Sequence, residues 1–447
     1  MVEKTCAGLV LSCVSATAWS DRLVLDAQGH VLEPSTACVA NVKAGPDARR
    51  QHELSFDWLS ASAGRHELVV KGLPPQNYFL CIEGFCAAKH SIDEYAQGVV
   101  LELNPDERHL AINKTGGAIV RAELRREWVG LLRQIPSSVD GTPQPCYFWA
   151  PEKAGAEPVP LIVGLHTWSG DYRQLDHYAS VWKEAQKRGW AFVGPNFRGP
   201  NNTPAACGGD LAVQDIVDAV NYAKRTVKID ERRVYIIGGS GGGHMTLLMV
   251  GRHPEVFAAG VAFCPITDLA RWHADSLLDH PGRGKHYAKM MEAACGGTPA
   301  EKPDEYRHRS PLTHLANARE AGMPVYIVTG IHDGWTGSVP VGHSFRAFNA
   351  LAQPADGISE EDIAAIERDQ RIPETLSGEK VSDPFYPEKI RIHFRWTSGN
   401  VQLTIFEGGH GGNFAAGYEF LSRQRKGRSA DFTLPKSAQG REERLGR

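Results

Sequence analysis

The pattern of apolar and polar positions changes near residue 137. Before that point, short apolar runs at 65–75 and 77–84 flank a Gly/Pro turn, and a second turn is predicted at 26–29. We therefore expect a small antiparallel β-sandwich within residues 20–105. The apolar spacing over 118–132 predicts a helix that connects this domain to the next.

After residue 137, apolar runs alternate with segments of helical periodicity. The expected strands cover 160–165, 191–195, 234–238, 259–263 and 324–329. The expected helices cover 178–187, 211–225, 244–252 and 344–351. A pair of strands is expected at 389–396 and 401–406. This alternation predicts an α/β fold, with a mostly parallel sheet that carries helices on both faces.

An insert is expected at about 353–383, between the last helix and the final strand pair. Its central helix, 359–368, begins with Ser359 and Asp362 in a capping-box arrangement. The apolar stripe of this helix is narrow, which predicts shallow docking on the surface. We expect the insert to shape substrate access without supplying catalytic groups.

The length of 447 residues predicts two or three domains. We place a β-rich domain with its connecting helix at 1–135, an α/β domain at 136–425 and a basic tail at 426–447. Lys+Arg 49 and Asp+Glu 52 leave a net charge of −3, which gives no electrostatic footprint for nucleic acid. No stretch has the length and apolar character of a membrane span.

The first 18 residues and the nine cysteines bear on the compartment. Residues 1–18 fit a secretory signal with a small-residue cleavage pattern, and they fit a first strand about equally well. Cys81 and Cys86 bracket a predicted turn. Cys207 and Cys295 lie in matching Ala-Cys-Gly-Gly contexts, which suggests a disulfide if the protein is exported. A secreted or periplasmic location is slightly favoured over a cytoplasmic one.

The strongest chemical signal is Gly238-Gly239-Ser240-Gly241-Gly242, which follows an apolar strand and opens a helix. A nucleophilic serine occupies this strand–turn–helix context in one class of hydrolases. Glycines leave room for the strand and helix to cross, and the helix N-terminus directs N–H groups, Gly241 first, at a developing oxyanion. The alternative is a glycine-rich turn that only connects two elements, and the context favours the nucleophile.

A serine nucleophile needs a base and an orienting acid. Asp333 and His410 each follow an expected strand, so both belong at one edge of the sheet. Asp268 is the rival acid, although its position favours a helix N-cap. His332 is expected to be a neighbour of the site.

Further site residues are expected on loops around the serine. The backbone N–H of Thr167 or Trp168, after an early strand, is expected to complete the oxyanion hole. His166, Trp272 and Trp335 are candidates for the wall of a substrate pocket.

Residues 137–425 resemble the catalytic domain of the prolyl oligopeptidase-like serine hydrolases, within the α/β-hydrolase superfamily. The matching stretches, in chain order, include Asn196-Phe-Arg-Gly, Gly-Gly-Ser240-Gly-Gly-Gly, Gly330-Ile-His-Asp333 and Gly408-Gly-His410-Gly. The resemblance implies Ser240 as nucleophile, Asp333 as acid and His410 as base. Two departures are an acid loop enlarged by three residues and an N-terminal region too short for the family's seven-bladed propeller.

The sequence therefore predicts a serine hydrolase that works through an acyl-enzyme. We expect an esterase acting on a small-molecule or glycan ester, an analogy drawn from the appended sandwich and the aromatic loops. A peptidase of the same family is the first alternative, and a non-catalytic sugar-binding protein on a hydrolase scaffold is the second. No cofactor or metal motif is visible, so none is expected. The acyl group, the alcohol and the oligomeric state do not follow from the sequence.

Overall fold

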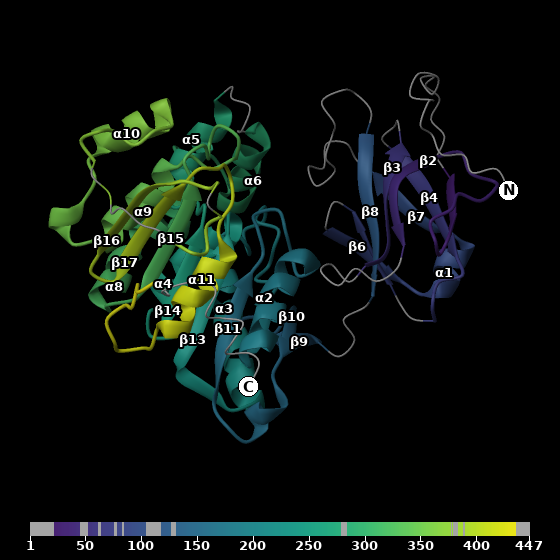
Figure 1. Ribbon diagram of the computed structural model, residues 1–447, viewed down its shortest axis with the longest axis horizontal. Helices are drawn as coiled ribbons and strands as arrows, with labels where there is room; N and C mark the ends of the chain where they lie inside the picture. Colours follow the sequence, from purple (N-terminus) through teal and green to yellow (C-terminus); the bar gives the residue numbers. More distant parts are fainter. Residues whose placement is uncertain are drawn as a thin grey trace. The chain divides into compact units, whose positions relative to one another are not determined.

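The computed structural model of the chain divides into two compact units (Figure 1). It describes residues 22–44, 52–60, 64–75, 78–82, 85–103, 118–126, 131–278, 284–376, 378, 383–387 and 389–434. The first unit takes its described residues from 1–130 together with 173–179, and the second from 131–172 and 180–447. The expected signal at 1–18 and the tail beyond residue 434 lie outside the described residues.

The first unit consists of two sheets and a short helix, α1 (Ile92–Gln97). A three-stranded sheet has the order β1 (Arg22–Asp26), β4 (Gly64–Lys71), β7 (Val99–Leu103). A five-stranded sheet has the order β2 (Cys38–Ala44), β3 (His52–Ser60), β8 (Ala118–Arg126), β5 (Tyr78–Ile82), β6 (Phe85–His90). Alternate residues of β3, namely Leu54, Phe56 and Trp58, join Leu23 and Leu68 in one buried core, which confirms two sheets around a common core.

Two expectations for this unit are wrong. β1 and β4 pair in parallel, so the sandwich is not purely antiparallel. Residues 118–126 form strand β8 rather than a helix, and β8 pairs with both β3 and β5. Pairing on both sides satisfies the backbone polar groups of β8, and this tertiary gain outweighs a local helical spacing.

The second unit is built on a nine-stranded sheet. Its order is β16 (Ile392–Ser398), β17 (Val401–Phe406), β15 (Val325–Gly330), β14 (Ala259–Phe263), β13 (Ile229–Gly239), β11 (Val159–Leu165), β12 (Ala191–Pro195), β10 (Pro143–Trp149), β9 (Leu132–Pro136). The strands from β17 to β12 in this order run parallel, while β16, β10 and β9 pair antiparallel with their neighbours. The predicted mostly parallel sheet is confirmed.

The helices of this sheet follow the expected alternation, with additional helices between β14 and β15 and after β17. They are α2 (Leu175–Arg188), α3 (Asp210–Thr226), α4 (Gly241–Arg252), α5 (Leu269–Leu277), α6 (Lys285–Cys295), α7 (Pro303–Arg309), α8 (Leu315–Glu320), α9 (Gly342–Leu351), α10 (Glu360–Asp369) and α11 (Phe414–Arg423). Short 3₁₀ turns are η1 (Glu152–Gly155), η2 (Pro311–Thr313) and η3 (Pro354–Asp356). None of the helices in the described part of the chain is long and apolar enough to cross a membrane.

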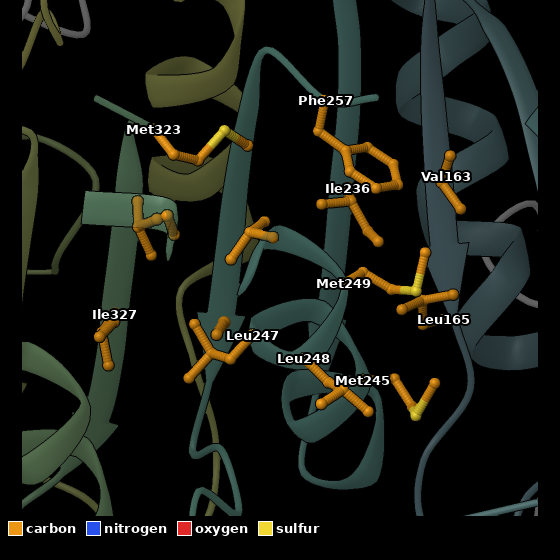
Figure 2. Packing of buried hydrophobic residues seen from close by; sticks show 14 of the residues in the cluster. Val163, Leu165, Ile236, Met245, Leu247, Leu248, Met249, Phe257, Met323 and Ile327 are labelled. Atoms are coloured by element: carbon orange, nitrogen blue, oxygen red, sulfur yellow. The ribbon is translucent and has the colours of Figure 1, made fainter. Parts of the chain in front are cut away.

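Strand β13 shows how the sheet carries helices on both faces. Ile236 joins Met249 of α4 in the main core, as Figure 2 shows. On the opposite face, the Ile237 side chain approaches Gly417 of α11, and the Tyr235 hydroxyl donates to the Gln424 carbonyl oxygen at 3.0 Å. Because successive side chains of a strand point to opposite faces, two-sided coverage requires the continuous apolar run seen in the sequence.

Helix α10 of the insert is more deeply anchored than the sequence predicted. Ser359 caps it through the Asp362 N–H at 3.1 Å. Ile363 and Ile366 are fully buried and belong to the main core. The expected shallow docking is therefore wrong: the stripe is narrow, but both of its isoleucines are inserted completely.

The cysteines also differ from expectation. Cys81 is disulfide-bonded. Cys207 and Cys295 are free and buried in one apolar cluster. The disulfide expected between these two is not formed in the structure.

Candidate active site

Ser240 occupies a strained turn between β13 and α4. Its backbone has φ 57° and ψ −119°, a conformation that costs free energy for a residue with a Cβ. The Ser240 N–H donates to the Phe263 carbonyl oxygen at 2.9 Å. A Cβ on Gly238 would lie 2.4 Å from the Gly242 carbonyl carbon, and one on Gly242 would lie 2.5 Å from a backbone oxygen of β11. The glycine spacing therefore permits the close crossing that presents Ser240 at the strand end.

Asp333 and His410 meet beyond the ends of the neighbouring parallel strands β15 and β17. The His410 Nδ1 lies 3.0 Å and 2.9 Å from the two Asp333 carboxylate oxygens. Asp333 is buried, and its Oδ1 also accepts from the N–H groups of Gly334 at 2.9 Å and Val339 at 3.3 Å. These bonds hold the carboxylate in place, so the acid can fix the ring orientation of His410.

The surroundings of His410 favour its charged form. Burial lowers the pKa of the imidazole, but the Cys264 sulfur and the Asp333 carboxylate raise it, and the net pKa lies well above its ordinary value. A quarter of the side chain is still exposed. The ring is therefore accessible to solvent and to a substrate, with which it can exchange protons.

The other ring nitrogen of His410 faces a residue that sequence reasoning missed. Cys264 follows β14, is buried, and places its Sγ 3.8 Å from His410 Nε2. Within the described residues, no hydrogen bond joins the Ser240 hydroxyl to His410. Cys264, Asp333 and His410 each offer an atom within 4.8 Å of the others, a spacing that a metal ion can bridge. The available signal was the position of Cys264, directly after a strand at the same edge of the sheet.

The expected oxyanion-hole residues lie together. A Cβ on Gly241 would lie 2.3 Å from the Trp168 nitrogen and 2.9 Å from the Thr167 carbonyl carbon. The backbone after β11 therefore packs directly on the first residue of α4, next to Ser240. This contact brings together the backbone positions that the sequence assigned to oxyanion binding.

The three residues expected to line a pocket have different surroundings. His166 is fully buried, its ring nitrogens lie 2.9 Å from the Thr167 oxygen and 2.7 Å from the Asn196 oxygen, and it stacks on Phe197. Trp272 is buried, and its Nε1 donates to a backbone oxygen at 2.7 Å. Trp335 is 37% exposed. Of these three, Trp335 is exposed, whereas His166 and Trp272 are buried within the loops.

The remaining candidates have structural partners. Asp268 caps α5 through the Arg271 N–H at 3.0 Å, as its alternative assignment expected. His332 lies beside the acid, with Nδ1 2.7 Å from the Gln370 side-chain oxygen and Nε2 2.8 Å from Glu407. His332 is thus a neighbour of the site.

The strand order, the turn at Ser240 and the paired groups after β15 and β17 define an α/β-hydrolase. Residues 177–364 match the model of the Prolyl oligopeptidase family. The resemblance to this family seen in the sequence is confirmed over this segment. The matched segment includes Ser240 and Asp333, and His410 lies beyond it.

Curated relatives include enzymes named as esterases and as peptidases. Feruloyl esterase B of Neurospora crassa is 34% identical over 128 residues, which are 26% of this chain and 42% of that protein. The acylamino-acid-releasing enzyme of Arabidopsis thaliana is 26% identical over 32% of this chain and 18% of that protein. Dipeptidyl aminopeptidase BIII of Pseudoxanthomonas mexicana is 31% identical over 39% of this chain and 26% of that protein. The chain spans less than half the length of each of these relatives. Together with the family match, they show that this chain is similar to enzymes of the serine hydrolase superfamily.

Solved structures of both kinds are also similar. An acylaminoacyl peptidase from Pyrococcus horikoshii has a TM-score of 0.46 at 16% identity, covering 90% of this chain and 52% of its own. An acetyl xylan esterase from Paenibacillus sp. R4 has a TM-score of 0.41 at 14% identity, covering 64% of this chain and 81% of its own.

Proposed function

We propose that this chain hydrolyses carboxylic esters through an acyl-enzyme, with Ser240 as nucleophile, His410 as general base and Asp333 as the orienting acid. The observation that carries the proposal is the acid–base pair: a buried carboxylate fixed by backbone N–H groups holds His410 Nδ1 at 2.9–3.0 Å. The strained turn at Ser240, in the same unit, supports it.

The reaction begins when the Ser240 oxygen attacks the ester carbonyl and His410 Nε2 takes the hydroxyl proton. Nε2 lies 3.8 Å from Cys264 Sγ, and we expect the Ser240 hydroxyl to approach it when substrate binds. Catalytic hydrogen bonds often tighten only when substrate binds. Asp333 stabilises the imidazolium that forms. The N–H groups of Gly241 and of Thr167 or Trp168 donate hydrogen bonds to the negatively charged oxygen of the tetrahedral intermediate. His410 then returns the proton to the leaving alcohol, and water clears the acyl group.

Support for an ester as the substrate comes from the feruloyl esterase B relatives. Exposed Trp335 offers an aromatic surface beside the acid, on which a carbohydrate-linked ester could pack. Peptide hydrolysis is the second candidate. It is favoured by the family match and by the acylamino-acid-releasing and dipeptidyl aminopeptidase relatives. The same triad serves either bond, so the substrate decides between them.

The experiment is a substrate panel run with wild-type protein and Ser240→Ala. We expect wild type to hydrolyse nitrophenyl acetate and feruloylated or acetylated glycans faster than chromogenic dipeptides or N-acetylated peptides. Ser240→Ala should remain folded, lose turnover by several orders of magnitude, and no longer react with a fluorophosphonate probe. Ser422→Ala, a substitution on α11, is the matched control and should label normally.

Normal activity in Ser240→Ala would refute the assignment of Ser240 as the nucleophile. Faster cleavage of the peptides would favour the peptidase. Binding of glycans without any hydrolysis by wild type would favour the non-catalytic alternative.

A further inference from the structure

The hydrolysis proposed above has no use for Cys264, yet this residue lies next to the base. Its side chain is buried, and its sulfur lies 3.8 Å from His410 Nε2. Asp333 occupies the opposite side of the ring, at Nδ1. A thiol, an imidazole and a carboxylate therefore lie in one cluster, with ligand atoms within 4.8 Å of one another.

From this cluster we infer that Cys264 and His410 bind a borderline-soft divalent cation, with Zn²⁺ as the representative, and that the bound ion blocks the base. Zinc bonds measure about 2.3 Å to a thiolate sulfur and about 2.0–2.1 Å to an imidazole nitrogen. With these lengths, an Sγ–Nε2 separation of 3.8 Å corresponds to an S–Zn–N angle of about 120°. The pair is thus spaced for a tetrahedral ion whose remaining positions are filled by water.

Asp333 adds a feature that is common around metal-binding histidines. A histidine that ligates through one nitrogen usually bonds a carboxylate or carbonyl through the other, which fixes the ring and raises its basicity. Asp333 makes that bond to His410 Nδ1 and is itself held by backbone N–H groups. The acid proposed for catalysis therefore also orients Nε2 toward the ion.

The ligand chemistry sets the choice of cation. Binding exchanges water on the ion for the Cys264 thiolate and the neutral His410 Nε2, and both the thiol proton and the Nε2 proton of the charged imidazole pass to solvent. Thiolate and imidazole favour Zn²⁺, whereas Mg²⁺ and Ca²⁺ prefer oxygen ligands. Selectivity for Zn²⁺ over Mg²⁺ is therefore expected.

Bound Zn²⁺ would occupy the nitrogen lone pair that must accept the serine proton. This consequence rests on the proposed function, whereas the binding of the ion does not. Zn²⁺ should act as a reversible inhibitor that a chelator removes.

The first test measures binding directly, on the full chain without a polyhistidine tag. Co²⁺ is used as the spectroscopic probe, since a cobalt–thiolate bond gives a charge-transfer absorption band in the near ultraviolet, and Zn²⁺ is titrated by calorimetry. We expect the band in wild type and in Cys146→Ser, which changes another buried free cysteine. Cys264→Ser should lose the band and bind Zn²⁺ at least about 10-fold more weakly, because even the loss of an outer partner of the histidine costs about 10–100-fold.

Wild type without the band, or Cys264→Ser with an unchanged Zn²⁺ affinity, would overturn the site. If Cys264→Ser does not fold, the wild-type spectrum still tests for a thiolate-bound ion, because the band requires a thiolate. Loss of the band in Cys146→Ser instead would show that the proposal names the wrong cysteine.

The second test follows nitrophenyl acetate hydrolysis in wild type and Cys264→Ser, each compared with its own rate without metal. At the Zn²⁺ concentration that halves the wild-type rate, Cys264→Ser should keep most of its own rate, Mg²⁺ should have no effect, and EDTA should restore wild type. Equal inhibition of both proteins would refute the inhibitory role. A wild-type protein without hydrolysis in the absence of metal would instead refute the proposed function, and the cobalt spectrum would still test the site.

Discussion

The glycine at position 337 offers a sharp test of the acid–base geometry. A Cβ placed on Gly337 would lie 2.3 Å from Asp333 Oδ1 and 2.3 Å from the Cβ of His410. Neither contact is tolerable for real atoms, so Gly337→Ala must push the acid and the base apart. The backbone of Gly337 lies outside the left-handed region, and the effect is therefore steric rather than conformational.

The expected loss of activity follows from how little Asp333 and His410 can move to accommodate the added methyl group. Relief of each contact requires a displacement of about 1 Å, and a misplacement of that size costs about 10²-fold in rate. Asp333 cannot simply rotate away, because its Oδ1 accepts from the N–H groups of Gly334 and Val339. We expect kcat/KM to fall by at least about 10²-fold, toward the roughly 10⁴-fold loss typical of a disabled triad acid. Overpacking should cost about 1–3 kcal/mol of stability.

The assay compares Gly337→Ala with Gly411→Ala in nitrophenyl acetate hydrolysis and thermal unfolding. Gly411 directly follows the base, but nothing lies within 4 Å of a Cβ placed there. Its alanine variant should therefore keep kcat/KM within about twofold. A folded Gly337→Ala protein with wild-type kcat/KM would refute the assigned acid–base pair, as would a loss of the same size in Gly411→Ala.

Three further predictions concern the surroundings of the site. Asp268→Ala should lower the free energy of unfolding in urea by about 1 kcal/mol through loss of a cap while kcat stays unchanged, and a folded but inactive variant would mean that the acid is assigned wrongly. Ile363→Ala should lower the free energy of unfolding by about 2–5 kcal/mol and exposed Glu361→Ala by less than about 0.5 kcal/mol, so equal values would contradict the burial of α10. Cys207 and Cys295 should react with a thiol reagent only after unfolding, and a linked pair in a non-reducing peptide map would contradict the free thiols.

The success of the fold prediction depends on how strands are buried. The ranges 191–195 and 259–263 match β12 and β14 because every residue in them is buried, and two-sided burial produces an unbroken apolar run. Strand β8 was missed because its partners are distant: the backbone pairs with β3 and β5, and Arg121 bonds Asp57 across the sheet at 2.9 Å. Such long-range pairing leaves no periodic signal in a window of ten residues.

The site residues likewise divide into those that contiguous sequence patterns predict and those that depend on long-range packing. Ser240 was predictable because the strand, the turn and the helix that define its role are contiguous in the chain. Asp333 and His410 were predictable because parallel strands end at one edge, so two residues 77 positions apart could be expected to meet. Cys264 follows β14 directly at the same edge, and that position was the available signal for its approach to His410. The burial of His166 and Trp272 depends on how loops pack on one another, and single-chain patterns carry no information on that packing.

The insert at about 353–383 contacts the loop that carries Asp333. The sequence predicted a segment that shapes substrate access without supplying catalytic groups. In the structure, the end of α10 is bonded to two residues close to the acid in the chain: the Trp335 Nε1 donates to the Glu367 carbonyl oxygen at 2.9 Å, and His332 Nδ1 lies 2.7 Å from the Gln370 side-chain oxygen. Since Ile366 of the same helix is fully buried, helix α10 is anchored in the core and holds the residues that make these bonds. The insert therefore braces the loop that carries Asp333, and changes in it will alter turnover together with access.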